Sequence, residues 1–531
     1  MKNHWVLVLL ILALAAFFRF WDLKSAPPGL WADEAVNGVN ALRVIETNPP
    51  AGGWKVFYPE NFGREGLFIN IQSVFVKSFG TEPWVLRLPS AIFGVLTILG
   101  LYLMTLELFR NSKLEIENSH GEFIALASSL FLATSFWHIN FSRIGFRAIM
   151  APFFLVWSFY FLLKGTSRRP TSYGRRTSII ILAGFTFGLG FHSYIAYRIA
   201  PVIALLPLWK FYKNWKNQEA GLPLGSPASK YCAPCFIGLF IFAAFIASLP
   251  LLWYYVQNPQ DFLGRTAAIS IFDAPSPLGQ FSENLIKTLG MFNIAGDFNW
   301  RHNLTGSPQL WWPVGILFLI GIWKSLKKLQ WPYSFVLLWF ITMLLPVAVS
   351  NESLPHALRA IILIPPAMIF AALGLNWLWE NVKPQFRIFI YIFLATAVLQ
   401  AYSQYFLHWA PNFNVHQAFQ TEITEKARWL KAEPKDIKKY VVTDAVDQAD
   451  TTGTPMSFQP IVFITDTFYS QKQAEKNIYY ISLKNLDYAD CSQKCEFLPV
   501  EYRPAIFKTI KQKIPGLRLD ASSGFVVLKN Y

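Results

Sequence analysis

The sequence predicts an α-helical polytopic membrane protein that carries a small α/β domain at its C-terminal end. Three observations lead to this fold class. Only 15% of the 531 residues are charged and 53% are hydrophobic, whereas soluble domains average about 25% charged residues. Long apolar runs recur over residues 1–410, and the composition becomes ordinary and charged after Trp409. A soluble enzyme and a disordered chain are both excluded, since 48 Phe and 20 Trp side chains cannot remain solvated.

Eleven runs are long and apolar enough to cross a bilayer, which needs roughly 20 apolar residues per helix. They lie near residues 5–21, 84–109, 122–140, 149–163, 178–193, 197–211, 233–256, 309–323, 332–349, 360–379 and 386–408. The first run resembles a signal peptide with Lys2 before it, but its small-residue site, Ala13-Leu14-Ala15, falls inside the apolar stretch. We therefore interpret this run as an uncleaved first span.

Lys and Arg residues in the short loops predict the orientation in the membrane. With the N-terminus inside, every strongly basic short loop faces the cytoplasm. These loops carry Arg110, Lys113, Lys164, Arg168, Arg169, Arg175, Arg176, Lys210, Lys213, Lys216, Lys230, Lys324, Lys327, Lys328, Lys383 and Arg387. Eleven spans then leave residues 22–83, 257–308 and 411–531 outside. We therefore expect an integral protein of the plasma (cytoplasmic) membrane with its C-terminal domain outside. Because the net charge of +15 is concentrated in these loops, we expect no nucleic-acid partner.

Residues 411–531 form the second predicted domain, a soluble α/β domain outside the membrane. Its helix-like stretches and strand-like runs alternate, at residues 418–432, 440–442, 461–464, 502–514 and 525–528. Cys491 and Cys495 either form a short-loop disulfide in an oxidising compartment or are two free thiols. Cys232 and Cys235 have CxxC spacing, but they open a span, which argues against a redox or metal role.

The first predicted outer loop, residues 22–83, places acids beside the membrane. Pro27-Pro28-Gly29 enforces an extended turn. Ala32-Asp33-Glu34-Ala35 then opens a helix that we expect to continue through Ile45. Two interpretations of Asp33 stay open: a helix N-cap, which contributes about 1 kcal/mol, or a functional carboxylate.

A second amphipathic helix is expected to begin within residues 61–68, where Glu65 adds another acid at the same interface. The later outer loops supply cations and hydrogen-bond donors, namely Arg143, Arg147, His192, Tyr194, Tyr197, Arg198, Arg301, His302, His356 and Arg359. The same loops also contain one candidate acid, Asp297. Snorkelling explains many membrane-edge arginines, but outside arginines run against the positive-inside bias. Arg359 follows His356 by three residues, so we expect both on one helical face, near a helix N-terminus that favours anions. This distribution of charge suits an anionic, phosphorylated lipid substrate.

These residues resemble the motifs of a known group, the dolichyl-phosphate-mannose–protein mannosyltransferase superfamily, which includes the aminoarabinose transferases of bacterial lipid A. The matching motifs are Arg19, Pro27-Pro28-Gly29-Leu30, Asp33-Glu34 and Arg87-Leu88-Pro89-Ser90-Ala91. Residues 355–360, Pro-His-Ala-Leu-Arg-Ala, look like the late signature of bacterial family-39-like members. The resemblance covers roughly residues 1–410. It implies the GT-C fold, interfacial helices in the first outer loop, an active site on the outer face, and inverting transfer from polyprenyl-phosphate sugars.

One stretch departs from the protein mannosyltransferases. A His-Pro-Pro-rich segment follows their first-loop acids, whereas Gly63-Arg64-Glu65-Gly66-Leu67 stands here. No β-trefoil-like insertion is present either. The acceptor therefore stays open between a lipid, a glycan and a protein, and the resemblance does not explain residues 411–531.

An inverting transfer assigns a role to each candidate residue. One carboxylate takes the proton of the acceptor hydroxyl, and a phosphate leaving group neutralised by cations needs no protonation. We expect Asp33 to be the base, with Glu34 and Glu65 orienting the acceptor or a divalent ion. The residues expected to bind the donor phosphate are Arg359, His356, Arg87, Arg301 and His302. No cofactor is certain; Glu65, Asp297 and His302 are the ligands available to a divalent metal ion, although no spacing demands one.

Two other classes of protein stay open as alternatives. A secondary transporter would show inverted repeats and interrupted midplane helices, and the sequence shows neither. A non-catalytic lipid-binding or assembly protein of the cell envelope would explain the C-terminal domain but would not need Asp33 and Glu34. We therefore expect a membrane glycosyltransferase, a hexosyl- or pentosyltransferase whose partners are a polyprenyl-phosphate-linked donor, an acceptor and membrane lipids.

Overall fold

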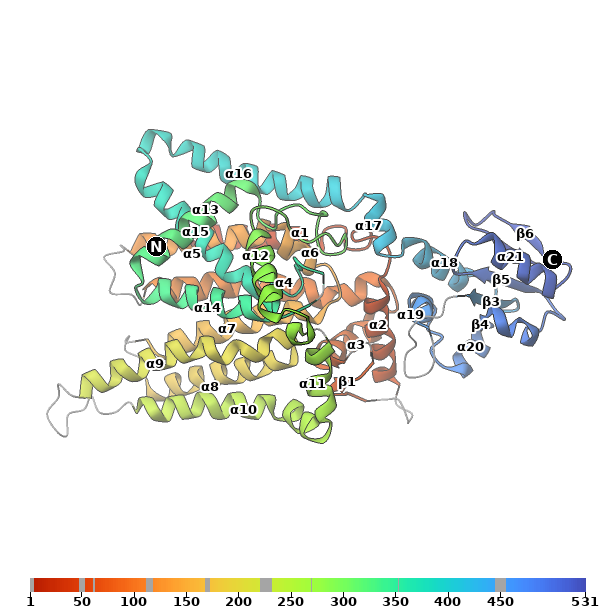
Figure 1. Ribbon diagram of the computed structural model, residues 1–531, viewed down its shortest axis with the longest axis horizontal. Helices are drawn as coiled ribbons and strands as arrows, with labels where there is room; N and C mark the ends of the chain where they lie inside the picture. Colours follow the sequence, from red (N-terminus) through yellow and green to blue (C-terminus); the bar gives the residue numbers. More distant parts are fainter. Residues whose placement is uncertain are drawn as a thin grey trace.

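The computed structural model describes residues 4–46, 53–60, 63–110, 118–167, 172–219, 232–268, 270–351, 353–444 and 455–531. Long helices form a bundle, and the N-terminus lies at one end of it (Figure 1). A domain that contains a β-sheet lies beyond the opposite end and holds the C-terminus (Figure 1). Some residues used to predict orientation and helix starts lie outside the described part of the chain: Lys2, Asn61, Phe62, Lys113, Arg168, Arg169 and Lys230.

Each of the eleven predicted runs coincides with a helix of the bundle. Seven of the described helices are long and apolar enough to cross a membrane. They are α4 (Pro83–Arg110), α7 (Met150–Gly165), α9 (Ala200–Glu219), α10 (Ala233–Gln257), α14 (Trp331–Ala348), α15 (Ile364–Asn381) and α16 (Ile388–Tyr402). Short helical segments extend four of them: η1 (Arg147–Ile149) precedes α7, η3 (Ile195–Ile199) precedes α9, η6 (Ile361–Leu363) precedes α15, and η7 (Pro384–Phe386) and η8 (Ser403–Trp409) flank α16. Four others have 17 residues each: α1 (His4–Phe20), α5 (Asn118–Thr134), α8 (Tyr173–Leu189) and α13 (Trp312–Lys328). The polytopic helical class is thus confirmed, and eleven as the number of spans stays a prediction.

The first loop contains two helices and a short hairpin. α2 (Ala32–Ile45) has the predicted bounds. Its N-cap is Trp31, without a side-chain cap hydrogen bond, so the interpretation of Asp33 as the N-cap is wrong.

The second helix of this loop, α3 (Leu67–Phe79), begins later than the sequence suggested. Arg64 and Glu65 form strand β2, which pairs with β1 (Phe57–Tyr58). The hairpin brings the backbone of Lys55 so close to Gly66 that a Cβ atom there would lie 2.0 Å from the Lys55 carbonyl oxygen. A glycine at position 66 therefore permits this hairpin, and the helix begins only after it.

Shorter elements connect the long helices. They are α6 (Phe136–Phe141), η2 (Gly190–His192), α11 (Pro259–Ala268), η5 (Ile271–Asp273) and α12 (Pro277–Gly290). Residues 353–360 form bends and turns, and helical structure resumes only at Ile361. The expectation that His356 and Arg359 share a helical face is therefore wrong. Pro365 and Pro366 in the first turn of α15 explain the late start, because proline is favoured at the first helical positions.

The C-terminal domain is built on a mixed five-stranded sheet with strand order β4-β3-β5-β7-β6. The strands are β3 (Lys438–Thr443), β4 (Ile478–Ser482), β5 (Cys495–Pro499), β6 (Arg518–Asp520) and β7 (Val527–Lys529). β3 runs parallel to both β4 and β5, and β7 runs antiparallel to β5 and β6. The helical elements are α17 (Phe413–Ala418), α18 (Thr421–Ala432), η9 (Met456–Phe458), α19 (Gln459–Thr465), α20 (Ser470–Lys476), η10 (Leu483–Tyr488) and α21 (Pro504–Lys513).

One predicted strand of this domain is wrong. Residues 461–464 belong to α19, not to the sheet. The run is completely buried, and periodicity cannot distinguish a short buried helix from a buried strand. Pro460 in the first helical turn is the local feature that favours the helix. Both cysteine pairs, Cys232–Cys235 and Cys491–Cys495, are joined as disulfides.

The C-terminal domain packs directly on the first loop, residues 22–83. Leu30, Val39 and Leu42 of that loop share one hydrophobic core with residues of the domain, among them Val441 and Phe463. α19 lies against α2, where a Cβ atom on Gly38 would be 2.5 Å from the Phe463 ring. Backbone and side-chain hydrogen bonds join the same surfaces, from Leu30 N to Thr424 Oγ1 at 2.8 Å and from Thr81 Oγ1 to the Ile464 carbonyl at 2.8 Å. The domain therefore supports α2 from the side away from the membrane helices (Figure 1).

Candidate active site

A polar cavity of about 430 Å³ lies where the first loop meets the later loops on the same side of the bundle. Its lining residues are Trp31, Asp33, Asn37, Arg64, Phe146, Arg147, Ala148, Tyr194, Asp297, Asn299, Arg301, His302, Ser353, His356, Leu358, Arg359 and Met456. The structure thus brings together Asp33, Asp297, Arg301, His302, His356 and Arg359, which the sequence singled out from three separate segments. Met456 comes from the C-terminal domain, so both predicted domains contribute to this cavity.

Asp33 lies on the first turn of α2 among cationic side chains. Burial lowers the pKa of Arg64 to about 10 and also lowers that of Arg301, while the negative charge of Asp33 raises both. Arg64 donates a hydrogen bond from Nη1 to Asn37 Oδ1 at 2.5 Å, and the Arg301 guanidinium lies 3.7 Å from the centre of the Trp31 ring. Asp33 therefore interacts electrostatically with two guanidinium groups.

Glu34 and Arg87 lie outside this cavity, although the sequence suggested functional roles for both. The Glu34 carboxylate accepts hydrogen bonds from Arg87 Nε at 3.1 Å, from Arg87 Nη2 at 3.2 Å and from the Gly145 backbone at 2.7 Å. Arg87 also donates to the carbonyls of Pro27 and Gly29, each at 2.6 Å. Both side chains are completely buried. We therefore assign this pair to fixing the Pro-Pro-Gly turn and the start of α2 against α4.

Glu65 is also buried, and it does not line the cavity. Its carboxylate accepts a hydrogen bond from Arg147 Nε at 2.6 Å. Arg147 is a lining residue, so Glu65 acts on the cavity through this arginine. The sequence analysis grouped Glu65, Asp297 and His302 as available metal ligands. In the structure, Asp297 and His302 lie together, and Glu65 does not belong to their group.

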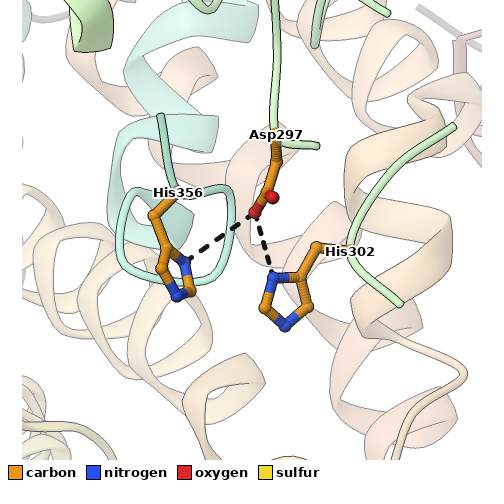
Figure 2. Close-up of side chains that lie close together, drawn as sticks. All are labelled: Asp297, His302 and His356. Atoms are coloured by element: carbon orange, nitrogen blue, oxygen red, sulfur yellow. Dashed lines mark hydrogen bonds and ion pairs between the residues drawn. The ribbon is translucent and has the colours of Figure 1, made fainter. Parts of the chain in front are cut away.

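Asp297 and two histidines form a compact cluster on the cavity wall (Figure 2). Asp297 Oδ2 accepts hydrogen bonds from His302 Nδ1 at 3.0 Å and from the Ala357 backbone at 2.8 Å. His356 Nδ1 lies 3.9 Å from the same oxygen. Burial raises the pKa of Asp297, but the hydrogen bond from His302 and the charges of the two histidines outweigh burial and lower it below its ordinary value. The cluster joins the loop before α13 to the turns before α15.

A second cavity, of about 440 Å³, adjoins the first and is mostly apolar. Its lining residues are Tyr194, Ile195, Ala196, Arg198, Ile199, Ser270, Phe272, Leu345, Pro346, Val349, Ser350 and Arg359. Tyr194 and Arg359 line both cavities. Arg359 Nη1 donates to Ser350 Oγ, which holds the guanidinium at this boundary. The joined cavities fit a molecule that has an anionic head and an apolar chain.

Sequence reasoning missed several of the residues that line the polar cavity. Arg64 was noted only as part of the Gly63–Leu67 stretch, and its place beside Asn37 depends on the hairpin between β1 and β2. Asn37 follows Asp33 by four residues, so helical spacing from Asp33 was the one signal that could have found it. Met456 reaches the cavity only because α19 packs on α2.

Comparison with protein families and curated sequences gives one match. The model of the dolichyl-phosphate-mannose-protein mannosyltransferase family matches residues 67–222, from α3 through α9. A search of curated protein sequences finds no match.

Solved structures match over almost the entire chain. ArnT from Cupriavidus metallidurans bound to undecaprenyl phosphate matches 100% of this chain and 99% of its own, with 13% sequence identity and a TM-score of 0.60. The apo state of ArnT matches 99% and 98% of the two chains, with 13% identity and a TM-score of 0.59. Archaeal oligosaccharyltransferase AglB from Archaeoglobus fulgidus, in complex with an inhibitory peptide and a dolichol-phosphate, matches 90% and 64% of the two chains, with 15% identity and a TM-score of 0.50.

The match to ArnT includes the C-terminal domain, which the motifs of residues 1–410 left unexplained. The GT-C fold expected from those motifs is confirmed. The chain thus has the fold of these structures, and part of it matches the family model of the dolichyl-phosphate-mannose-protein mannosyltransferases.

Proposed function

We propose that this protein is an inverting glycosyltransferase that moves a sugar from a polyprenyl-phosphate-linked donor to an acceptor hydroxyl at the outer face of the membrane. One observation carries the proposal: a charged cavity and an apolar cavity meet at Tyr194 and Arg359. A polyprenyl phosphate has this amphipathic form. The ArnT structure was obtained with undecaprenyl phosphate and the AglB structure with dolichol-phosphate, which supports a donor of this class.

In the proposed reaction, the acceptor oxygen attacks the anomeric carbon as the bond from that carbon to the phosphate oxygen breaks. The acceptor proton goes to the Asp33 carboxylate, which acts as the general base. The phosphate leaves with the bonding electron pair, and Arg359 and Arg301 stabilise the charge that develops on it. His302 and His356 line the same polar cavity as Asp33. Transfer on the face of the sugar opposite the phosphate inverts the anomeric centre.

The alternatives explain fewer of these features. A secondary transporter needs a site reached from both sides near the middle of the bilayer, whereas this cavity is lined partly by the first loop and the C-terminal domain. A non-catalytic lipid-binding protein would use the apolar cavity but has no need of Asp33 among guanidinium groups.

Donor binding can be measured with three ligands that separate the two cavities. We expect undecaprenyl phosphate to stabilise the purified protein against thermal unfolding in a saturable manner. Undecaprenol lacks the phosphate and should bind at least about tenfold more weakly, because a charge-assisted hydrogen bond contributes roughly 1.5–3 kcal/mol. Inorganic phosphate lacks the chain and should bind more weakly still. Equal binding of undecaprenol and undecaprenyl phosphate would contradict a phosphate site at Arg359.

A variant that fills the apolar cavity tests whether the lipid chain of the donor binds there. Ala196 lines this cavity, and Ala196→Trp should weaken binding of undecaprenyl phosphate at least about tenfold, since excluding two methylene groups costs about 1.6 kcal/mol. Leu278→Trp is the matched control, because Leu278 is 82% exposed and lies on α12 outside this cavity. Similar binding by the two variants would exclude this cavity as the lipid site.

The proposed orientation places the N-terminus inside and residues 411–531 outside. Ser172 precedes α8 and Ser522 lies between β6 and β7, and both are exposed. A cysteine at position 172 should react with an impermeant thiol reagent only after cells are broken, and a cysteine at position 522 should react in intact cells. Labelling of both from one side would show that the number of spans between them is even rather than odd.

A further inference from the structure

We propose that Trp137, Asn140 and Arg143 are positioning residues that hold Asp33 and the arginines of the polar cavity in fixed relative places. The inference rests on the proposed function, because it uses the roles given there to Asp33 and the arginines. All three side chains are completely buried, and none of them lines either cavity. They therefore act on a bound donor or acceptor only through the segments that they hold.

The three residues lie in and just after α6, a helix of six residues that are all buried. Successive residues of an α-helix point about 100° apart, so neighbouring side chains of one short helix reach different parts of the structure. Buried polar groups need hydrogen-bond partners. The indole, amide and guanidinium groups donate to backbone carbonyls of three other segments. These segments carry the candidate residues of the cavity.

Asn140 and Trp137 bind the two loops that carry Arg301 and Arg359. Asn140 Nδ2 donates to the carbonyl of Arg301 at 2.7 Å, and Arg301 itself lines the polar cavity. Trp137 Nε1 donates to the carbonyl of Ala357 at 2.9 Å, two residues before Arg359. Both carbonyls belong to turns and not to a helix or a strand. The bonds from α6 therefore fix irregular backbone at the two places where these arginines enter the cavity.

Arg143 binds the first loop, which carries Asp33. Its Nη2 and Nε donate to the carbonyl of Ala26 at 2.7 Å and 3.2 Å. The Gly145 backbone, two residues later, donates to Glu34 Oε1 at 2.7 Å. Because Ala26 precedes the turn that leads into α2 and Glu34 is the neighbour of Asp33, these bonds set where α2 begins. The proposed base and the arginines are thus held by one short segment of the chain.

Relative placement matters in a group transfer, because the attacking atom and the leaving group must be aligned. A displacement of about 1 Å caused far from the chemistry can lower turnover about 100-fold. Asn140 and Trp137 hold arginines that we propose to bind the phosphate, so their loss should affect both donor binding and turnover. Arg143 holds the loop of the base, so its loss should affect turnover alone. A residue that merely stabilises the fold would not separate the two quantities.

The kinetics of three variants measure this separation. Trp137→Phe and Asn140→Leu each lose one donor but keep much of the side-chain shape, and Arg143→Lys keeps the charge but lacks the planar two-pronged donor. Each should lower kcat about 10- to 100-fold. Trp137→Phe and Asn140→Leu should also weaken binding of undecaprenyl phosphate about 2- to 12-fold, as for one lost hydrogen bond, whereas Arg143→Lys should bind it as wild type does. The donor in the assay is the lipid-linked sugar fraction extracted from cells that lack the gene, and membranes of those cells supply the acceptor.

Trp339→Phe and Asn376→Leu are the matched controls. Both side chains are buried, and each donates one hydrogen bond. Neither residue lines a cavity. These variants lose the same groups as Trp137→Phe and Asn140→Leu, so thermal unfolding should show a similar loss of stability. Their turnover and their binding of undecaprenyl phosphate should stay at the wild-type values.

Hydrogen exchange of the unliganded protein tests the positioning without any substrate. Asn140→Leu should speed exchange of residues 297–303, and Trp137→Phe should speed exchange of residues 353–360. Each variant should keep the wild-type rate in the other segment, because local opening follows the hydrogen bond that is lost. The two control variants should leave both segments unchanged.

Three results would overturn the proposal. They are wild-type kinetics in all three variants, equal losses of turnover in the control variants, and faster exchange of both segments in each variant, which indicates a general loosening of the fold. Failure of the proposed function is a different result, in which the wild-type protein neither binds undecaprenyl phosphate nor transfers a sugar. The exchange pattern alone then decides whether these residues position the loops.

Discussion

Asp33→Asn should lower the turnover of sugar transfer at least about a hundredfold, which is the scale of a general-base contribution. The amide has nearly the size of the carboxylate, but it cannot accept the acceptor's proton. Asp33 does not cap α2 and lines the polar cavity, so the substitution should not disturb the helix. Donor binding should remain near its wild-type value, because the base acts on the acceptor.

The matched control for this variant is Asp22→Asn. Asp22 lies in the same loop, is exposed and does not line the cavity. Its φ of 51° is a conformation that asparagine adopts readily. We expect this control to keep wild-type turnover in a sugar-transfer assay with saturating donor. Near-wild-type turnover by Asp33→Asn would leave the cavity without its proposed base.

Arg359→Ala should lower sugar transfer about 10- to 150-fold, which corresponds to the roughly 1.5–3 kcal/mol of a charge-assisted hydrogen bond. Arg359→Lys should also lose activity, because lysine lacks the planar two-pronged contact of a guanidinium with phosphate. The negative charge on the phosphate grows as the sugar departs. The loss should therefore appear in kcat at saturating donor as well as in donor affinity.

A snorkelling arginine behaves differently, and Arg387 provides that control. Its guanidinium lies 4.4 Å from the centre of the Trp379 ring, at the inner end of α15 and α16 by the orientation proposed above. Arg387→Lys should keep transfer activity, because lysine has a flexible stem and a charge of the same sign. If Arg359→Lys also keeps wild-type kinetics, Arg359 is a membrane anchor and the phosphate site must lie elsewhere.

The sequence predicts the membrane helices well, because bilayer thickness sets their length and forces their side chains to be apolar. All eleven runs coincide with helices, and α2 has the predicted bounds. Where tertiary packing decides the local structure, the same reasoning fails. Residues 461–464 are apolar enough for a strand, but they form α19 against α2.

The residues that line the polar cavity were predicted in part, for a related reason. Asp33 and Glu34 are consecutive acids in one motif, and the sequence predicts a functional role for both. Consecutive residues of an α-helix point about 100° apart, so only Asp33 faces the cavity while Glu34 binds Arg87. The partner of an acid can lie 50 or more residues away, as Arg87 and Arg147 do from Glu34 and Glu65. No spacing rule within one segment can reveal such a pair.

The central claim is that this chain transfers a sugar from a polyprenyl-phosphate donor, and mass spectrometry of lipid-linked sugars tests it most directly. Cells that lack the gene are compared after they receive the wild-type gene, the Asp33→Asn variant or the Asp22→Asn control. With Asp33→Asn, we predict that one polyprenyl-phosphate-linked sugar accumulates and that one lipid, glycan or protein of the envelope loses the mass of that sugar. Wild type and Asp22→Asn should restore both. Identical lipid-linked sugars and identical envelope glycans with wild type and with Asp33→Asn would contradict the assignment as a glycosyltransferase.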